Sequence, residues 1–187
     1  MELSDVIKAR RSVRYFVDGE VTKEQIEDIL YHGTLAPSAK NKQPWQFVVL
    51  QGESKNKAAD LMIAYDADES NAEEKAAIGY FNSITPTAEV IKNAPVLILI
   101  FREKDDIWTV GDNLSIGACV ENMLLRAVDL GLATVWIRDI VYVDKQVADM
   151  VGHGDLELNC AISLGVPGQF PPQRPRKPVD EVTEWFD

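Results

Sequence analysis

An unbroken apolar run, "APVLILIF" from Ala94 to Phe101, constrains the fold of this chain more than any other feature. It is far too short to span a bilayer, and it shows no alternation of polar and apolar residues. This pattern, bounded by Pro95, predicts a β-strand that is buried on both faces. Three further strands are predicted, at "PWQFVVLQG" (44–52), "ATVWI" (133–137) and "LELNCAISLGVP" (156–167).

Helical patterns lie between these strands. Ser4 is predicted to cap the first helix, and Thr22 with Gln25 forms the capping-box pattern at the start of the second. Helical segments are predicted at 3–10, at 22–36, over 54–92 with a break near Pro86, and at 144–151. Because helices and strands mix without regular β–α–β alternation, the expected fold class is α+β. We expect one domain over residues 1–187, in which the proline-rich stretch 168–187 forms an extended C-terminal arm.

The segment 111–137 contains a long helix that is apolar around nearly its whole circumference. Asp112 or Asn113 is predicted to cap it, and Gly131 to end it in the left-handed conformation. Such a helix can be the central core helix of one subunit, or a second subunit can cover one of its faces. We favour the second explanation, since Gly117 and Ala118 would let another helix approach closely.

The formal net charge of −11 excludes the broad basic surface of a nucleic-acid or membrane-surface binder. No signal peptide is visible, so a cytoplasmic protein is expected. Cys119 and Cys160 lie among apolar residues and are interpreted as buried small hydrophobes. His32 and His153 lack partners at metal-ligand spacing, so no metal site is expected. No glycine-rich phosphate loop of the Walker or Rossmann type is present.

Two short basic stretches stand out in this acidic chain. The first holds Arg10, Arg11, Ser12 and Arg14, and the second holds Arg174, Arg176 and Lys177 between prolines. Arginine meets phosphate oxygens bidentately, so either stretch could bind a phosphate. The alternatives are a solvated helix end for the first stretch and a solvated tail for the second.

A third stretch, "APSAKNKQPWQF" from Ala36 to Phe47, is a loop stiffened by Pro37 and Pro44. It carries neutral donors and acceptors that could recognise a flat polar ring, namely Ser38, Asn41 and Gln43. The alternative is a capped turn in which Trp45 anchors the core.

Five stretches, taken in order, resemble the FMN-dependent nitroreductase family. They are "RRSVRYF" (10–16), "APSAKNKQPWQF" (36–47), "LGLATVWI" (130–137), "LGVP" (164–167) and "RPRKP" (174–178). The resemblance covers nearly the whole chain, from Val6 to Trp185. It implies a central, mostly antiparallel sheet flanked by helices, in an intertwined homodimer with two FMN sites at the subunit interface.

The resemblance also implies a role for each site residue. Arg10, Arg11 and Ser12 would meet the FMN phosphate from one end of the chain, and Arg174 and Arg176 from the other. Arg14 would lie by the pyrimidine end of the flavin ring. The partner subunit would supply Pro37, Ser38 and Asn41, with Gln43 also in the cofactor site. A backbone N–H near Arg138 and Asp139 would face flavin N5, at a turn where many members have glycine.

The implied activity is that of an oxidoreductase in which NAD(P)H reduces FMN and a small-molecule acceptor, such as a nitroaromatic or a quinone, then reoxidises it. No side chain need act as nucleophile in this ping-pong cycle. Two alternatives stay open at this point. The chain could run another flavin reaction on the same scaffold, or it could bind FMN without turnover as a store or sensor.

Overall fold

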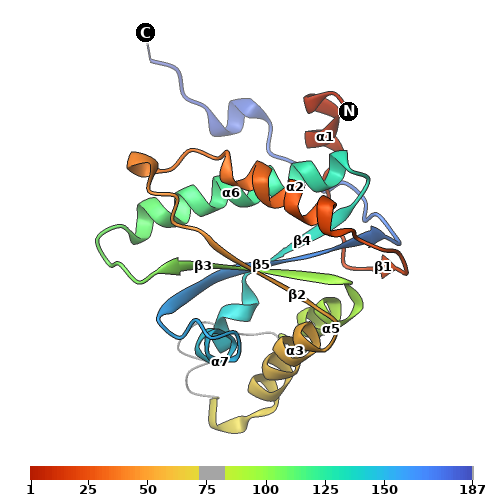
Figure 1. Ribbon diagram of the computed structural model, residues 1–187. Helices are drawn as coiled ribbons and strands as arrows, with labels where there is room; N and C mark the ends of the chain where they lie inside the picture. The colour runs from red at the N-terminus through yellow and green to blue at the C-terminus, as the bar shows by residue number, and fades with distance from the viewer. Residues whose placement is uncertain (72–82, 187) are drawn as a thin grey trace.

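The computed structural model describes residues 1–71 and 83–186 and has three layers, with one β-sheet between two layers of helices (Figure 1). The sheet contains β1 (Phe16–Val17), β2 (Gln46–Gln51), β3 (Val96–Glu103), β4 (Ala133–Ile137) and β5 (Leu156–Pro167). The strands lie in the order β1-β5-β3-β2, and β4 also pairs with β5. Every pair of these strands is antiparallel, which confirms the predicted α+β class.

The strand predicted from the apolar run is β3, and it lies between β2 and β5. Its side chains alternate between two separate cores, one on each face of the sheet. The first core receives Leu97, Leu99 and Phe101, and the second receives Val96, Ile98 and Ile100. All six are completely buried, so the prediction of a strand covered on both faces is confirmed.

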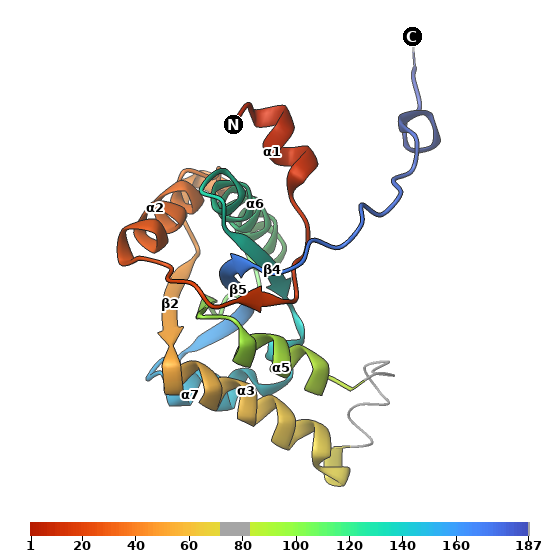
Figure 2. The same ribbon diagram turned by 90° about the vertical axis from the view of Figure 1, so that its right-hand side faces the viewer.

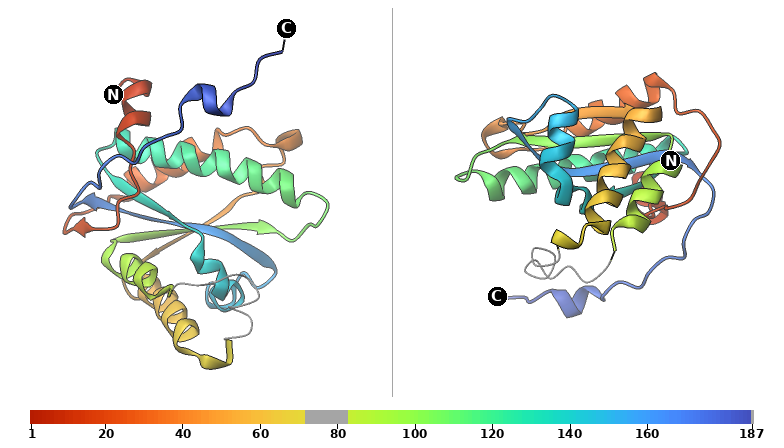
Figure 3. Two further views of the ribbon diagram at one scale, coloured as in Figure 1. Left: turned by 180° about the vertical axis from the view of Figure 1, so that it is seen from behind. Right: turned by 90° about the horizontal axis from the view of Figure 1, so that it is seen from below.

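Each core is closed by its own helices (Figures 1 and 3). One face of the sheet carries α2 (Lys23–Thr34) and α6 (Thr109–Asp129), with α1 (Leu3–Ala9) beside α6. The other face carries α3 (Gly52–Ala67), α5 (Thr85–Asn93) and α7 (Asp144–Met150). Part of the helical stretch predicted over 54–92 falls on residues 72–82, which lie outside the described residues.

The predicted helix ends are partly right. Thr22 caps α2 with the full capping box, since its side chain accepts from the N–H of Gln25 and the Gln25 side chain accepts in return. Gly131 follows α6 with φ +76°, as predicted. The prediction of Ser4 as a cap is wrong, because the N-cap residue of α1 is Glu2, two residues earlier, and the helix begins at Leu3. Helix α6 likewise begins at Thr109, not after Asp112 or Asn113.

Helix α6 packs one side against the sheet and α2 and leaves another side open. Its buried side includes Ile116, Val120, Met123 and Leu124. By contrast, Val110 is 74% exposed and Leu114 is 72% exposed, and Ile107, just before the helix, is 89% exposed. We call these three residues the open face of α6. Within one subunit, therefore, α6 is not buried on all sides.

The C-terminal arm leaves the sheet where β5 ends and runs away from the body beside the connection between α1 and β1 (Figure 2). It contains a single helical turn, η4 (Val179–Val182), and is otherwise extended. Its apolar side chains Val182, Trp185 and Phe186 are largely exposed. Within the residues that the structure describes, no helix has the length and apolar character needed to cross a membrane.

Helices α2 and α6 approach each other closely at Gly33. A Cβ added there would lie 2.7 Å from Met123 Cγ and 3.1 Å from Cys119 Sγ, both in the buried core. Gly33→Val is therefore expected to lower the free energy of unfolding by about 1–3 kcal/mol through overpacking. Urea titration would measure this change.

A matched variant on the neighbouring helix is Gly111→Ala, since a Cβ there would come no closer than 3.8 Å to another side chain. It should be neutral or slightly stabilising, because alanine favours helix more than glycine does. Equal destabilisation by both variants would contradict the assignment of Gly33 to a tight helix contact.

Candidate functional site

Short strand pairings bring the two ends of the chain together. Val13 donates its N–H to the Thr134 carbonyl (2.9 Å), which attaches the N-terminal basic stretch to the edge of β4. Three residues later β1 pairs with Val166 and Pro167, the last residues of β5. The N–H of Gly168 then donates to the Tyr15 carbonyl (3.0 Å). The C-terminal arm therefore begins beside the N-terminal basic stretch, although the two are distant in sequence (Figure 2).

These two stretches line one pocket of about 270 Å³. From the N-terminal side it is lined by Arg10, Arg11, Ser12 and Arg14, and from the arm by Pro171, Pro172, Gln173, Arg174 and Arg176. We call it the arginine pocket. It holds five arginines, and none of the described residues that line it is acidic. In a chain of net charge −11, such a concentration of cations favours an anion.

The arginine side chains are largely free of acidic partners. Arg10 Nε lies 3.5 Å from Glu121 Oε1, a long contact to a half-exposed carboxylate. Arg11 donates to the carbonyls of Lys8 (2.6 Å) and Arg10 (2.8 Å). Arg176 donates to the carbonyl of Arg174 (3.0 Å). Apart from Arg10, no arginine of the pocket has an ion pair with a described carboxylate, so their positive charge is not neutralised there.

A second pocket, of about 290 Å³, shares Arg14 with the first. It lies between the end of β4 and the start of α5 and is lined by Arg14, Pro86, Thr87, Val90, Val135, Trp136, Ile137, Arg138 and Asp139. We call it the β4 pocket. Thr87 Oγ1 donates to Asp139 Oδ2 (3.0 Å), which ties α5 to the turn after β4. The β4 pocket is more apolar than the arginine pocket in the residues that line it.

The turn after β4 begins the short 3-10 helix η3 (Asp139–Val143), with Arg138 as its N-cap residue. The first N–H groups of such a helix have no acceptor inside it, so they can bind a group in an adjoining pocket. Arg138 and Asp139 thus place two side chains of opposite charge, and the first N–H groups of a helix, at the edge of the β4 pocket.

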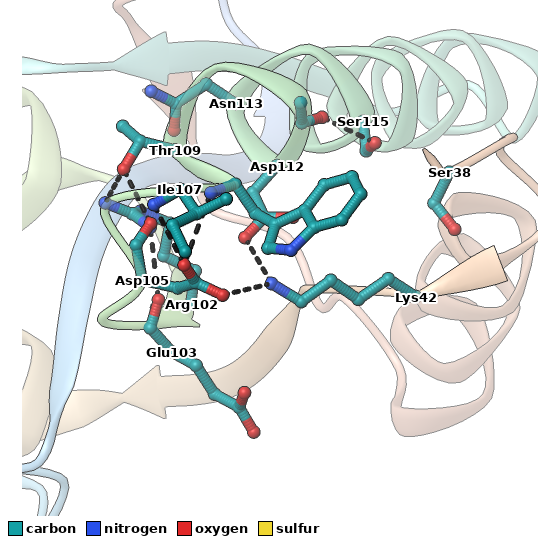
Figure 4. Close-up of polar contacts among 12 residues, drawn as sticks. Ser38, Lys42, Arg102, Glu103, Asp105, Ile107, Thr109, Asp112, Asn113 and Ser115 are labelled. Carbon is teal, nitrogen blue, oxygen red and sulfur yellow. Dashed lines mark hydrogen bonds and ion pairs between the residues drawn. The ribbon is translucent and has the colours of Figure 1, made fainter. Parts of the chain in front are cut away.

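The loop predicted to recognise a ring lies elsewhere in the subunit. Pro37, Ser38, Asn41 and Gln43 are absent from the described lining of both pockets. The loop is ordered internally: Gln43 donates its N–H to Ser38 Oγ (3.0 Å), and Asn41 donates its own to the Ser38 carbonyl (3.0 Å). It lies against the start of α6, where Lys42 Nζ reaches Asp112 (Figure 4). The hydrogen bond to Asp112 raises the pKa of Lys42.

A model of the nitroreductase family matches residues 7–166, which include the N-terminal basic stretch, the loop and the sheet except for its last residue, Pro167. The chain belongs to the nitroreductase family. The family predicted from the five sequence stretches is therefore confirmed.

Similar proteins cover almost all of this nitroreductase-family chain. The Bacillus subtilis protein YfhC, provisionally named an NAD(P)H nitroreductase, is 26% identical over 97% of this chain and 93% of its own length. An iodotyrosine deiodinase of Hydra vulgaris is 26% identical over 97% of this chain and 71% of its own length. A solved structure from Desulfovibrio desulfuricans, in complex with FMN, is 27% identical, with a TM-score of 0.77 over 100% of this chain and 99% of that one.

Several residues in or beside the two pockets escaped the sequence prediction for this nitroreductase-family chain. Thr87 lies in the predicted helical stretch but has no local pattern that distinguishes it from other helix residues. Glu121 reaches Arg10 only because α6 passes beside the N-terminal stretch. Trp136 lies within the quoted stretch "LGLATVWI", and its partial exposure could have been anticipated only by knowing which face of β4 is open.

The two cysteines do not belong to either pocket. Both are buried and unpaired, as predicted. Burial raises the pKa of Cys119 to about 12 and that of Cys160 to about 11, so both thiols stay protonated at neutral pH. A protonated thiol is a poor nucleophile. In the described part of the chain, no three His, Cys, Asp or Glu residues gather into a group that could hold a metal ion.

Proposed function

We propose that this protein is an FMN-dependent oxidoreductase that takes electrons from NAD(P)H and passes them to a nitroaromatic, a quinone or a related small acceptor. The observation that carries the proposal is the arginine pocket, in which the two ends of the chain meet beside the β4 pocket. Family membership supports it, as does the likeness to a solved relative in complex with FMN.

The residues of the arginine pocket fit the FMN phosphate. A phosphate monoester carries nearly two negative charges at neutral pH, and guanidinium groups bind its oxygens through charge-assisted hydrogen bonds. Arg10, Arg11 and Ser12 would approach it from one side, and Arg174 and Arg176 from the arm. Because the described lining holds no carboxylate, the dianion would meet only cationic and neutral groups in the lining itself.

The residues of the β4 pocket fit a flat ring that extends from that phosphate. Arg14 belongs to both pockets, so it can stand beside the ring while its neighbours hold the phosphate. In that position its positive charge would favour the reduced, anionic form of the ring. Trp136 and Val90 would give an apolar wall that excludes water, and the N–H groups at Arg138 and Asp139 would be available to the edge of the ring.

When bound, FMN would supply the redox chemistry by accepting a hydride from the nicotinamide and giving two electrons to the acceptor. The protein would contribute binding, orientation and charge. Its buried thiols are not required as nucleophiles, which agrees with their raised pKa values.

The complete site in this proposal needs two subunits. The loop with Pro37, Ser38, Asn41 and Gln43 lines neither pocket of its own subunit, which is compatible with a role in the site of a partner. The open face of α6 and the exposed apolar end of the arm give such a partner apolar surface to cover. We therefore propose a homodimer with two FMN sites.

The decisive test is the absorbance spectrum of the purified protein. We expect bound FMN, released on denaturation, bleaching of its band by NADH or NADPH without oxygen, and recovery of the band on adding a nitroaromatic or a quinone. Release of FAD, or no binding of added FMN, would overturn the proposal. Bound FMN that neither nicotinamide bleaches would instead support a flavin store or sensor.

The similarity to the Hydra vulgaris deiodinase supports a second candidate reaction on the same scaffold. In it, the two electrons and a proton would replace iodine on a phenol ring by hydrogen, with release of iodide. Iodide release from iodotyrosine by the reduced protein, measured beside reduction of a nitroaromatic, would separate the two activities.

A further inference from the structure

The loop that carries Ser38 and Asn41 has a strained backbone. Lys40, Asn41 and Gln43 have φ values of 54°, 55° and 50°, in the left-handed region. Asparagine tolerates this region better than other residues, but lysine and glutamine rarely adopt it. Strained segments of this kind persist only where the surroundings hold them, and they are common at ligand-binding sites. The contacts that hold this loop therefore indicate which residues keep it in its strained conformation.

Lys42 makes the strongest of these contacts (Figure 4). Its Nζ lies 2.8 Å from Asp112 Oδ2 and 3.4 Å from Asp105 Oδ2. Asp112 lies in the first turn of α6 and is only 1% exposed. Asp105 is itself fixed, because it accepts the N–H groups of Ile107 (3.0 Å) and Trp108 (3.3 Å). Lys42 thus connects the middle of the strained loop to the start of α6 and to the turn before it.

Two weaker contacts hold the same loop. Lys40 Nζ lies 5.0 Å from the centre of the Trp108 ring, within the range of a cation–π interaction. Ala39 packs beside Gly111, where an added Cβ would lie 3.9 Å from the Ala39 Cβ. All these contacts end on residues 105–112, so the loop is clamped onto one short segment.

The pairing of Lys42 with Asp112 is costly to break. Asp112 Oδ1 is buried and has no hydrogen-bond partner among the described residues, so Lys42 is the group there that compensates its charge. Buried charges are retained only when they are paired, and removal of one partner leaves the other uncompensated. The ion pair of Lys42 with a buried carboxylate, which is costly to bury, therefore fixes a loop whose backbone would otherwise relax to an unstrained conformation.

We propose that Lys42 is a positioning residue, whose ion pair with buried Asp112 holds the strained loop in the conformation that presents Ser38 and Asn41 to the flavin of the partner subunit. This inference rests on the proposed function. Lys42 does not touch the cofactor itself; it acts through its immediate neighbour Asn41, whose backbone it restrains. Its effect is therefore on FMN binding in the partner's site, and not on the arginine pocket of its own subunit.

The first test replaces Lys42 by methionine, which keeps the length of the side chain and removes the charge. We expect Lys42→Met to weaken FMN binding about ten-fold or more, because the loop would no longer hold Ser38 and Asn41 in place for the cofactor. The matched control is Lys92→Met. Lys92 Nζ lies 2.7 Å from Asp60, and its side chain is 31% exposed against 26% for Lys42, but it lies on α5 away from the loop. The control should bind FMN as the parent does.

The second test separates positioning from a general loss of fold. Lys42→Met and Arg10→Ala chains are co-expressed with different affinity tags, and the heterodimer is purified through both tags. If the loop acts in the partner's site, one site joins the intact arginines of the Lys42→Met chain to the intact loop of the Arg10→Ala chain. The heterodimer should then bind one FMN with parental affinity, while each mutant homodimer binds weakly.

The outcomes are distinct. If the parent protein binds no FMN, the proposed function fails, and the inference that rests on it fails as well. If the parent binds FMN and Lys42→Met binds it as tightly as Lys92→Met does, the positioning role is wrong and the proposed function stands. If Lys42→Met binds weakly and the heterodimer regains no site, Lys42 acts on its own subunit or on folding, and the inference is overturned.

Discussion

Replacement of either Arg10 or Arg176 by alanine is expected to weaken FMN binding by roughly ten- to a hundred-fold. Each arginine would lose a charge-assisted contact to the phosphate, worth about 1.5–3 kcal/mol. The two residues come from opposite ends of the chain but line the same pocket of about 270 Å³. The double mutant should therefore deviate from additivity, because residues that share one ligand group are coupled. Titration of the apoprotein with FMN measures all these affinities.

Riboflavin gives the control for this prediction, since it lacks the phosphate. Its affinity should barely respond to either substitution. Lysine at either position should recover only part of the FMN affinity, because it keeps the charge but loses the planar fork. Equal losses for FMN and riboflavin would mean that the arginines support the fold and do not bind phosphate. Parental FMN affinity in both single mutants would leave the two stretches as solvated ends.

The elements that the sequence predicted well are those with a local cause. The strand over Ala94–Phe101 needs only its own unbroken apolar pattern, and β3 occupies it. The capping box of Thr22 and Gln25 is closed within one helical turn. Gly131 ends α6 because glycine alone adopts its positive φ without strain. In each case, the interactions that decide the structure lie within a few residues.

The errors come from contacts with distant parts of the chain. Asp112 was a reasonable N-cap on local grounds, but its carboxylate turns to Lys42, and α6 begins three residues earlier. Strand β1 has only two residues, too few for any periodicity to be detected. Its pairing with β5 nevertheless determines where the C-terminal arm starts. Sequence patterns do not contain these long-range pairings.

The candidate site was predictable in part for the same reason. Arginines gathered in an acidic chain are conspicuous in the sequence, and the structure brings both groups to one pocket. The roles of Thr87 and Glu121 depend on α5 and α6 passing beside other segments. The left-handed backbone of the loop around Asn41 could not be predicted either, because the contacts that hold this loop come from the start of α6, far along the chain.

Replacement of Leu114 by glutamate is expected to convert the proposed dimer to monomers and to lower FMN affinity by about a hundred-fold or more. Leu114 is 72% exposed in the subunit and forms the open face of α6 with Val110 and Ile107. A carboxylate buried there without a partner would cost several kcal/mol. In this subunit, the side chain is exposed, so the fold of the monomer should survive. Sedimentation would measure the mass, and FMN titration the affinity.

Two further variants make this prediction specific. Leu114→Met keeps the apolar contact and should remain dimeric with parental FMN affinity. Gly117→Leu should act like the glutamate, because a Cβ at Gly117 meets only Trp136, at 3.9 Å, among the described residues of its own subunit, which leaves room there for a partner to approach. A monomeric Leu114→Glu protein that still binds FMN with parental affinity would contradict the two-subunit site, because the loop carrying Ser38 and Asn41 would then be dispensable.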